Sequence, residues 1–113
     1  MNRGDVVEVE WLYTDMTGSK CRPAVVVQAD FLNRLIDDCV LVQITGTRHG
    51  IPNTEVLLDP AVETGSGLTK VCCASCTNLL TIEQDRVLRN VGYLSDAAMR
   101  QIEMCLRAVL DIP

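Results

Sequence analysis

The stretch TGSKCRPAVVVQAD, residues 17–30, marks the passage from a polar loop into an apolar strand. The run that follows the proline is rich in valine, which favours β-structure. Proline lacks a backbone N–H and is best accommodated as the first residue of a strand. The pattern therefore predicts a strand over Ala24–Gln28, introduced by Pro23. It leaves open whether Lys20 and Arg22 are solvated loop residues or are directed at a substrate.

Further short strands are expected on both sides of this stretch. Residues 5–11 alternate apart from the Val6–Val7 step, as in a half-buried strand. One face carries Val7, Val9 and Trp11, and the other carries Glu8 and Glu10. A short loop or helical turn is expected over 31–37, and a turn at 65–67. A series of short strands with spaced turns is typical of a closed or nearly closed barrel. The other expected strands are Asp38–Thr45, Thr54–Leu58 and Lys70–Ser75.

The C-terminal part of the chain changes from strand to helix periodicity. Ser95 is a suitable helix N-cap, and Asp96 falls in the first turn, where its charge favours the helix dipole. We expect this helix to cover one open side of the barrel, within a single domain over 1–113 that is mainly β. Apolar residues recur behind the cap at steps of three and four, which gives one apolar face: Ala98, Met99, Ile102, Cys105, Leu106, Val109 and Leu110.

The net charge argues against a broad electrostatic grip on nucleic acid. The 113 residues carry 15 acidic and 10 basic side chains, a net charge of −5. Between residues 20 and 49, however, cations gather and can form one local basic concavity on an acidic protein. No apolar run is as long as a membrane span, and no secretory segment opens the sequence, so we expect a cytoplasmic protein without a membrane partner.

Six cysteines raise the question of a disulfide or metal framework. In a reducing cytosol, cysteine behaves as a small buried hydrophobe. Cys73 and Cys76 have the spacing of a redox or half-zinc motif, but no second pair at zinc-finger spacing follows, and His49 is the only histidine. We expect reduced core thiols and no cofactor, with a thiol or metal module at Cys72, Cys73 and Cys76 as the competing hypothesis.

The motifs RGDVVEVEW, GSKCRPAVVVQAD, LVQITGT, CTNLLTIEQDRV and GYLSDAAMRQIEMCL follow one another from Arg3 to about Leu110. In this order the chain closely resembles the MazF/PemK family of toxin–antitoxin endoribonucleases. The resemblance implies an SH3-like small β-barrel that forms a homodimer. It also implies metal-independent, sequence-specific cleavage of single-stranded RNA and inhibition by a cognate antitoxin of a type II system. The family's catalytic arginine falls on Arg22, and its strand-closing threonine falls on Thr45.

The residue types at these two positions suit the cleavage of RNA by its own 2′-hydroxyl. The protein must orient the in-line attack, stabilise charge on the phosphoryl oxygens and move protons. A guanidinium offers a planar fork of donors for two phosphate oxygens, so Arg22 is suited to charge stabilisation. Thr45 can add a hydroxyl donor.

The general base is not identified by the sequence. An arginine stays protonated and is a poor proton acceptor. Members of the PemK branch have an arginine and an acid on either side of the cysteine that corresponds to Cys76. This chain has Ser75 and Thr77 at those two positions. His49 is a candidate substitute, because histidine titrates near neutrality. The other expected substrate-binding residues are Ser19, Lys20, Arg48, His49, Thr77 and Asn78.

The departure at Ser75 and Thr77 leaves a second interpretation open. The chain can be a catalytically weak or inactive member of the same fold, which binds RNA, an antitoxin or DNA gyrase without cleaving RNA.

Overall fold

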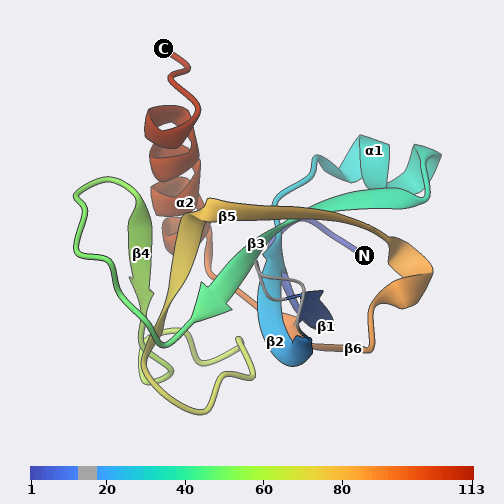
Figure 1. Cartoon of the computed structure of the whole chain (residues 1–113), viewed down its shortest axis with the longest axis horizontal. Coiled ribbons are helices and arrows are strands. Elements are labelled where there is room, and N and C mark those ends of the chain that lie inside the picture. Colours follow the sequence, from blue (N-terminus) through green and yellow to red (C-terminus); the bar gives the residue numbers. More distant parts are fainter. Residues whose placement is uncertain (13–17) are drawn as a thin grey trace.

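The computed structural model describes residues 1–12 and 18–113, and at Leu12 and Ser19 it describes the backbone alone. The described residues form strands, two α-helices and one short 3-10 helix (Figure 1). In chain order they are β1 (Asp5–Leu12), β2 (Ser19–Val26), α1 (Asp30–Leu35), β3 (Asp38–Thr45), β4 (Glu55–Leu58), β5 (Cys72–Glu83), η1 (Gln84–Arg86), β6 (Arg89–Tyr93) and α2 (Asp96–Val109).

The strands form one antiparallel sheet in the order β4-β5-β3-β2-β1-β6. The sheet curls into a half-barrel, and α2 stands beside β4 and β5 (Figure 1). The connection between β4 and β5 crosses to the opposite edge, where the Tyr93 N–H donates to the Gly65 carbonyl at 2.9 Å. The loop that follows the edge strand β4 therefore contacts the other edge strand, β6. The predicted small β-barrel with a C-terminal helix is confirmed.

Apolar side chains cover both faces of the sheet because successive residues of a strand point to opposite sides. On the α2 side, Val25 and Val42 pack with Ile102 of the helix. On the other side, Val7 packs with Leu41. The expected inward face of 5–11 is confirmed, since Val9 is buried and Trp11 packs against the same cluster as Val7.

The C-terminal helix begins where the sequence predicts. Ser95 is its N-cap, and the Ser95 hydroxyl oxygen accepts from the Ala98 N–H at 3.1 Å. Ala98, Met99, Ile102 and Cys105 are buried. Leu110 is an exception to the predicted apolar face, because it is the C-cap and half of it is exposed.

Two strand predictions differ from the structure, and one strand has no prediction. The loop expected before Pro23 lies partly outside the described residues, and from Ser19 onward it is strand, because β2 pairs with β1 through residues 19–25. Pro23 is therefore inside β2 and not its first residue. It is tolerated there because β3 pairs with β2 only from Ala24 onward. The predicted strand Lys70–Ser75 begins later and runs on to Glu83. The polar edge strand β6 was not predicted.

None of the helices that the structure describes is long and apolar enough to span a membrane.

Candidate functional site

The sheet splits between β2 and β3 at Pro23. The two strands pair at Ala24 and Gln43 but no further along β2 toward its start. The next residue of β2 in that direction is Pro23, which has no N–H to donate to β3. Beyond it, β3 diverges from β2 and stays paired with β5 (Figure 1).

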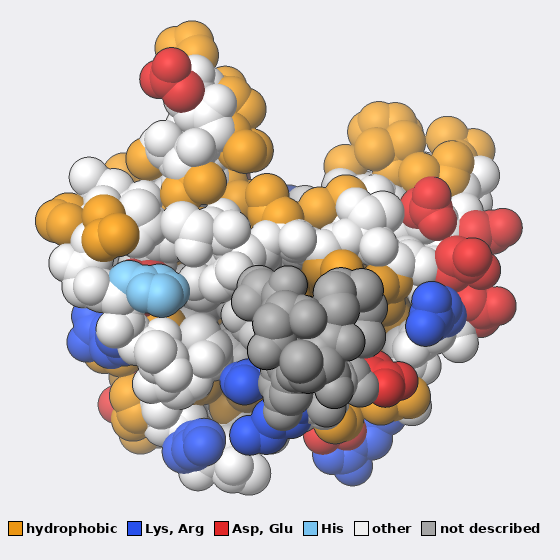
Figure 2. Space-filling view, in the orientation of Figure 1, with side chains coloured by type: hydrophobic (Ala, Val, Ile, Leu, Met, Phe, Trp, Pro, Cys, Tyr) orange, Lys and Arg blue, Asp and Glu red, His pale blue; other side chains and the backbone are white. Residues whose placement is uncertain are grey.

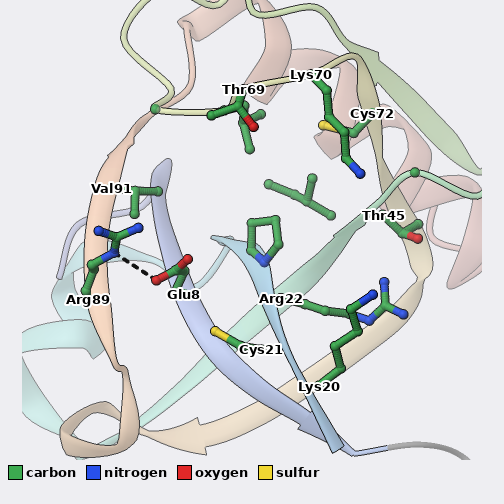
Figure 3. Close-up of a pocket in the computed structure, with 15 residues that line it drawn as sticks. Glu8, Lys20, Cys21, Arg22, Thr45, Thr69, Lys70, Cys72, Arg89 and Val91 are labelled. Atoms are coloured by element: carbon green, nitrogen blue, oxygen red, sulfur yellow. Dashed lines mark hydrogen bonds and ion pairs between the residues drawn. The ribbon is translucent and has the colours of Figure 1, made fainter.

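A pocket of about 280 Å³ fills this division (Figure 3). Its apolar surface comes from β2, β3, β6 and the β4–β5 loop, and its charged side chains come from β1, β2, β6 and the same loop. It is lined by Glu8, Lys20, Cys21, Arg22, Pro23, Ile44, Thr45, Gly46, Gly67, Leu68, Thr69, Lys70, Cys72, Arg89 and Val91.

The structure brings both predicted catalytic residues into this pocket. Arg22 is half-buried on β2, and Thr45 closes β3. Figure 3 shows the side chains of Lys20 and Arg22 extending on the same side of β2, toward Thr45. The Thr45 hydroxyl oxygen accepts from the Thr47 N–H at 3.2 Å, which leaves the hydroxyl proton free to be donated.

The pocket is positively charged although the protein is acidic. Among the described residues that line it, four are cations and one is a carboxylate. Among the described residues, no hydrogen bond or ion pair engages the side chains of Lys20, Arg22 or Lys70. Figure 2 shows lysine and arginine side chains gathered in the lower part of the view, whereas many acidic side chains lie at the right. This pocket can attract an anion such as a phosphodiester.

Glu8 and Arg89 form an ion pair on the β1 and β6 side of the pocket. The Arg89 Nε donates to Glu8 Oε2 at 2.8 Å. Neither residue was singled out in the sequence, because each lies at a polar position of a separate strand. Only the pairing of β1 with β6, which sets Glu8 opposite Arg89, brings them together.

Lys70 enters the pocket on the β4–β5 loop. Gly67 of this loop has a φ of +72°, and a Cβ there would run into the carbonyl oxygen of Val91. The absence of a side chain at Gly67 thus allows the loop to lie directly on β6. This contact holds the following residues, Leu68 to Lys70, over the pocket.

Arg48 and His49 do not line the pocket. They lie in the exposed loop after β3, where Arg48 Nε approaches Glu55 Oε1 at 3.7 Å. Glu55 also accepts from the backbone N–H of His49 at 3.2 Å and of Gly50 at 2.9 Å. These hydrogen bonds, that of Gly50 first, hold the pKa of the Glu55 carboxyl below its usual value. Arg48 thus contributes to loop structure, and His49 remains exposed.

Thr77 and Asn78 lie inside β5 and not after it. The register of β3 with β5 shifts between Val42 and Gln43, so 76–78 form a bulge. The Asn78 amide donates to the Ser75 hydroxyl at 2.9 Å, and the hydroxyls of Ser75 and Thr77 lie 3.4 Å apart. Residues that face each other share a side of the sheet, so the row Ala24–Gln43–Ser75 places this polar group on the side to which Arg22 also points.

Ser19 starts β2, opposite Leu12 of β1. The structure does not describe the side chain of Ser19.

The cysteines of β5 are part of the core. Cys72 and Cys76 belong to the apolar cluster on the α2 side, whereas Cys73 Sγ lies 3.6 Å from Glu55 Oε2 on the other side. Burial raises the pKa of Cys73 to about 11 and that of Cys76 to about 12. Within residues 1–12 and 18–113, no group of three or more metal-ligating side chains could hold a metal ion.

The whole chain is similar to proteins of one known family. A family model described as "PemK-like, MazF-like toxin of type II toxin-antitoxin system" matches residues 2–110. A mycobacterial endoribonuclease, solved in complex with its cognate antitoxin, is 26% identical with a TM-score of 0.80, over 100% of this chain and 97% of that chain.

Two more solved structures share the fold. The toxin MazF-mt6 of Mycobacterium tuberculosis is 24% identical with a TM-score of 0.77, over 98% of this chain and 99% of that chain. A chain from a MazE-MazF crystal of Deinococcus radiodurans is 16% identical with a TM-score of 0.76, over 100% and 98%.

Proposed function

The chain belongs to the family of PemK-like and MazF-like toxins of type II toxin–antitoxin systems, and from this premise we propose that it cleaves single-stranded RNA at a short sequence, with Arg22 and Thr45 at the cut phosphate. MazF-family toxins are endoribonucleases. The observation that carries the proposal is the convergence of Arg22 and Thr45, from two different strands, on one cationic pocket.

The proposed reaction uses the RNA's own 2′-hydroxyl. The 2′-oxygen forms a bond to the adjacent phosphorus, and the bond from phosphorus to the 5′-oxygen breaks. A base takes the proton of the 2′-hydroxyl, and the leaving 5′-oxygen gains a proton. The products are a 2′,3′-cyclic phosphate and a 5′-hydroxyl, with no metal in the step.

Each side chain has a role that follows from its donors. The Arg22 guanidinium donates to two phosphoryl oxygens as charge gathers on them. The Thr45 hydroxyl donates to one of these oxygens, which its acceptor bond from Thr47 leaves it free to do. Lys20 and Lys70 hold neighbouring phosphates.

The test is an oligoribonucleotide assay in excess EDTA. The wild type is expected to cut a mixed RNA pool at a short common sequence and to leave cyclic phosphate ends. One 2′-deoxy substitution at the cut position should abolish cleavage there. Intact RNA across the whole pool, with protein whose melting curve shows it to be folded, would refute the proposal.

A specific observation favours a second function, RNA binding without cleavage. Ser75 and Thr77 stand where members of the PemK branch have an arginine and an acid that could exchange protons. The hydroxyls of Ser75 and Thr77 interact with each other, and the Ser75 hydroxyl accepts from the Asn78 amide. On this hypothesis the uncut RNA pool still binds and Arg22→Ala abolishes binding. Trapping of DNA gyrase on DNA is a third outcome that the same purified protein can be assayed for.

We also propose an antitoxin whose acidic segment lies across the Arg22 pocket, and a homodimer. Charge complementarity with the cations of the pocket supports the first, and Arg22→Glu should weaken antitoxin binding. The edge strand β4 and exposed apolar side chains such as Phe31 and Leu35 support the second. Light scattering at several protein concentrations measures the oligomeric state.

A further inference from the structure

The pocket has a second compartment, on the other side of Pro23 from Arg22. Glu8 of β1 faces Pro23, whereas Arg22 faces Val9. Because successive side chains alternate, Glu8 and Pro23 point to one side of the sheet and Arg22 points to the other. Figure 3 shows Glu8 beside Arg89 on one side of the pocket, whereas Arg22 lies on the side of Thr45.

The second compartment combines apolar walls with one hydrogen-bond acceptor. Pro23, Ile44, Leu68 and Val91 supply the apolar surface. Arg89 fixes Glu8 by one oxygen, Oε2, at 2.8 Å. Among the described residues, no hydrogen bond engages the other oxygen of Glu8. A carboxylate that is held at one oxygen can offer the second one to a ligand in a fixed direction.

These properties match a nucleobase better than another phosphate or an acidic peptide. A flat base can pack on proline, isoleucine and valine, and the pocket of about 280 Å³ is at the small end of ligand sites. The Glu8 carboxylate repels a second anion. An ionised carboxylate only accepts hydrogen bonds, so it pairs well with the amino groups of cytosine, adenine and guanine. The N3–H of uracil can also donate, but it lies between two carbonyl oxygens that repel the carboxylate, so uracil is disfavoured.

The two compartments are close enough to hold one nucleotide and the next phosphate. Glu8 faces Pro23, the residue that follows Arg22, from the neighbouring strand, and Glu8 and Arg22 both line the same pocket. On this basis we propose that the Glu8 compartment binds the base next to the phosphate held by Arg22, and that it selects a base with an amino group over uracil. This inference rests on the proposed RNA substrate but not on cleavage.

The experiment separates base selection from cleavage. Sequences that bind are selected from a randomised 2′-fluoro RNA pool, which lacks the attacking hydroxyl, and cleavage of ordinary RNA is assayed in parallel. For the wild type we expect one position at which uracil is depleted by about tenfold. Glu8→Gln should remove this depletion, because a glutamine amide can also donate to uracil. Glu83→Gln, a change of the same type at the exposed end of β5, should retain it.

A second variant guards against a folding artefact. Glu8→Arg combined with Arg89→Glu keeps an ion pair between β1 and β6 but moves the carboxylate from β1, where it faces Pro23, to β6. It should melt like the wild type and should also lose the depletion of uracil.

The outcomes distinguish the proposed base compartment from the proposed nuclease function. Uracil depletion that depends on Glu8, without any cleavage, supports the base compartment and refutes the nuclease function. Cleavage with uracil accepted at every position, or depletion that survives Glu8→Gln, overturns the base compartment and leaves the nuclease function standing. Failure to bind RNA, including the case in which the same pocket binds only an antitoxin, overturns both.

Discussion

Arg22 and Thr45 each lie two residues beyond Ala24 and Gln43, the last pair in the register of β2 and β3, and both line the same pocket. Pro23 ends the pairing because it has no N–H to offer β3. Each strand keeps its other partner, since Arg22 faces Val9 and Thr45 faces Cys73. The two side chains are therefore held by rigid strands across a gap that a phosphate can enter.

Replacing Arg22 tests the role of the charged fork. Arg22→Ala is expected to lower the cleavage rate by about 100- to 1,000-fold, because one donor to the charged transition state is lost. Arg22→Lys keeps the charge but loses the two-donor geometry, so an intermediate rate is expected. Arg34→Ala, at an exposed site on α1, is the matched control. Equal rates for Arg22→Ala and the control would exclude a catalytic role for Arg22.

Replacing Thr45 tests the hydroxyl donor. Thr45→Val preserves the shape of the side chain and should lower kcat by about tenfold, less than Arg22→Ala, because a neutral donor makes a weaker hydrogen bond than a charged one. Thr45→Ser should restore most of the rate. A change confined to KM would show that Thr45 binds the substrate equally in the ground state and the transition state.

The elements with a clear period could be predicted from the sequence. Asp38–Thr45 alternates and is β3, and the helix cap at Ser95 stands before an apolar repeat. The start of β2 could not be predicted, because Ser19–Arg22 is polar and is strand only through its pairing with β1. In β5 the bulge at 76–78 breaks the alternation, so the sequence pattern does not predict the second half of the strand.

The site was predictable only in part, for a related reason. Arg22 and Thr45 are carried by short motifs, and the structure places both in the pocket. Glu8, Lys70 and Arg89 carry no local motif, because they meet only through the curl of the sheet and the crossing of the β4–β5 loop. Arg48 lies outside the pocket, in the loop after β3, where it forms an ion pair with Glu55. A role for Arg48 in binding substrate stays a prediction.

Cys21 is expected to be the one thiol that reacts rapidly in the native protein. It is exposed, whereas the other five cysteines are buried, and burial raises their pKa values and lowers the fraction of reactive thiolate. A disulfide-forming dye at pH 8 should therefore modify one thiol quickly and the rest only after unfolding.

A bulky maleimide on Cys21 should also slow RNA cleavage, because Cys21 lines the pocket beside Arg22. Cys21→Ser protein should be insensitive to the reagent. Rapid modification of two or more thiols in the folded wild type would contradict the burial of the core cysteines.

Glu55 is expected to make the fold sensitive to acid. Its pKa is lowered in the folded protein, chiefly by the Gly50 N–H, so the carboxylate stabilises the fold above the usual pKa of 4.5. This contribution is lost as pH falls through the lowered folded value. Glu55→Gln should thus reduce stability toward urea at pH 7 and have little effect at pH 2 to 3. Glu83→Gln should change neither, and an equal loss for Glu55→Gln at both pH values would contradict the linkage.

Ser95 connects the C-terminal helix to the loop that carries Lys70. Its hydroxyl caps Ala98 and donates to Glu63 Oε2 at 2.8 Å, while its N–H donates to Glu63 Oε1 at 2.7 Å. Glu63 lies in the β4–β5 loop and only 7% of it is exposed. Ser95→Ala removes the cap and one hydrogen bond to a buried carboxylate, so we expect a loss of about 3 kcal/mol in the free energy of unfolding.

The same change should affect the pocket through the loop. Amide hydrogen exchange over 59–71 is expected to quicken in Ser95→Ala, and RNA affinity should fall, because Glu63 no longer holds the loop fully against the helix. Asp96→Ala, in the exposed first turn of α2, should cost only about 0.3 to 1 kcal/mol and leave exchange over 59–71 unchanged. If the two variants lose equal stability and exchange alike, Ser95 acts as a helix cap alone and the loop is held in place by Gly65 and Gly67 on β6.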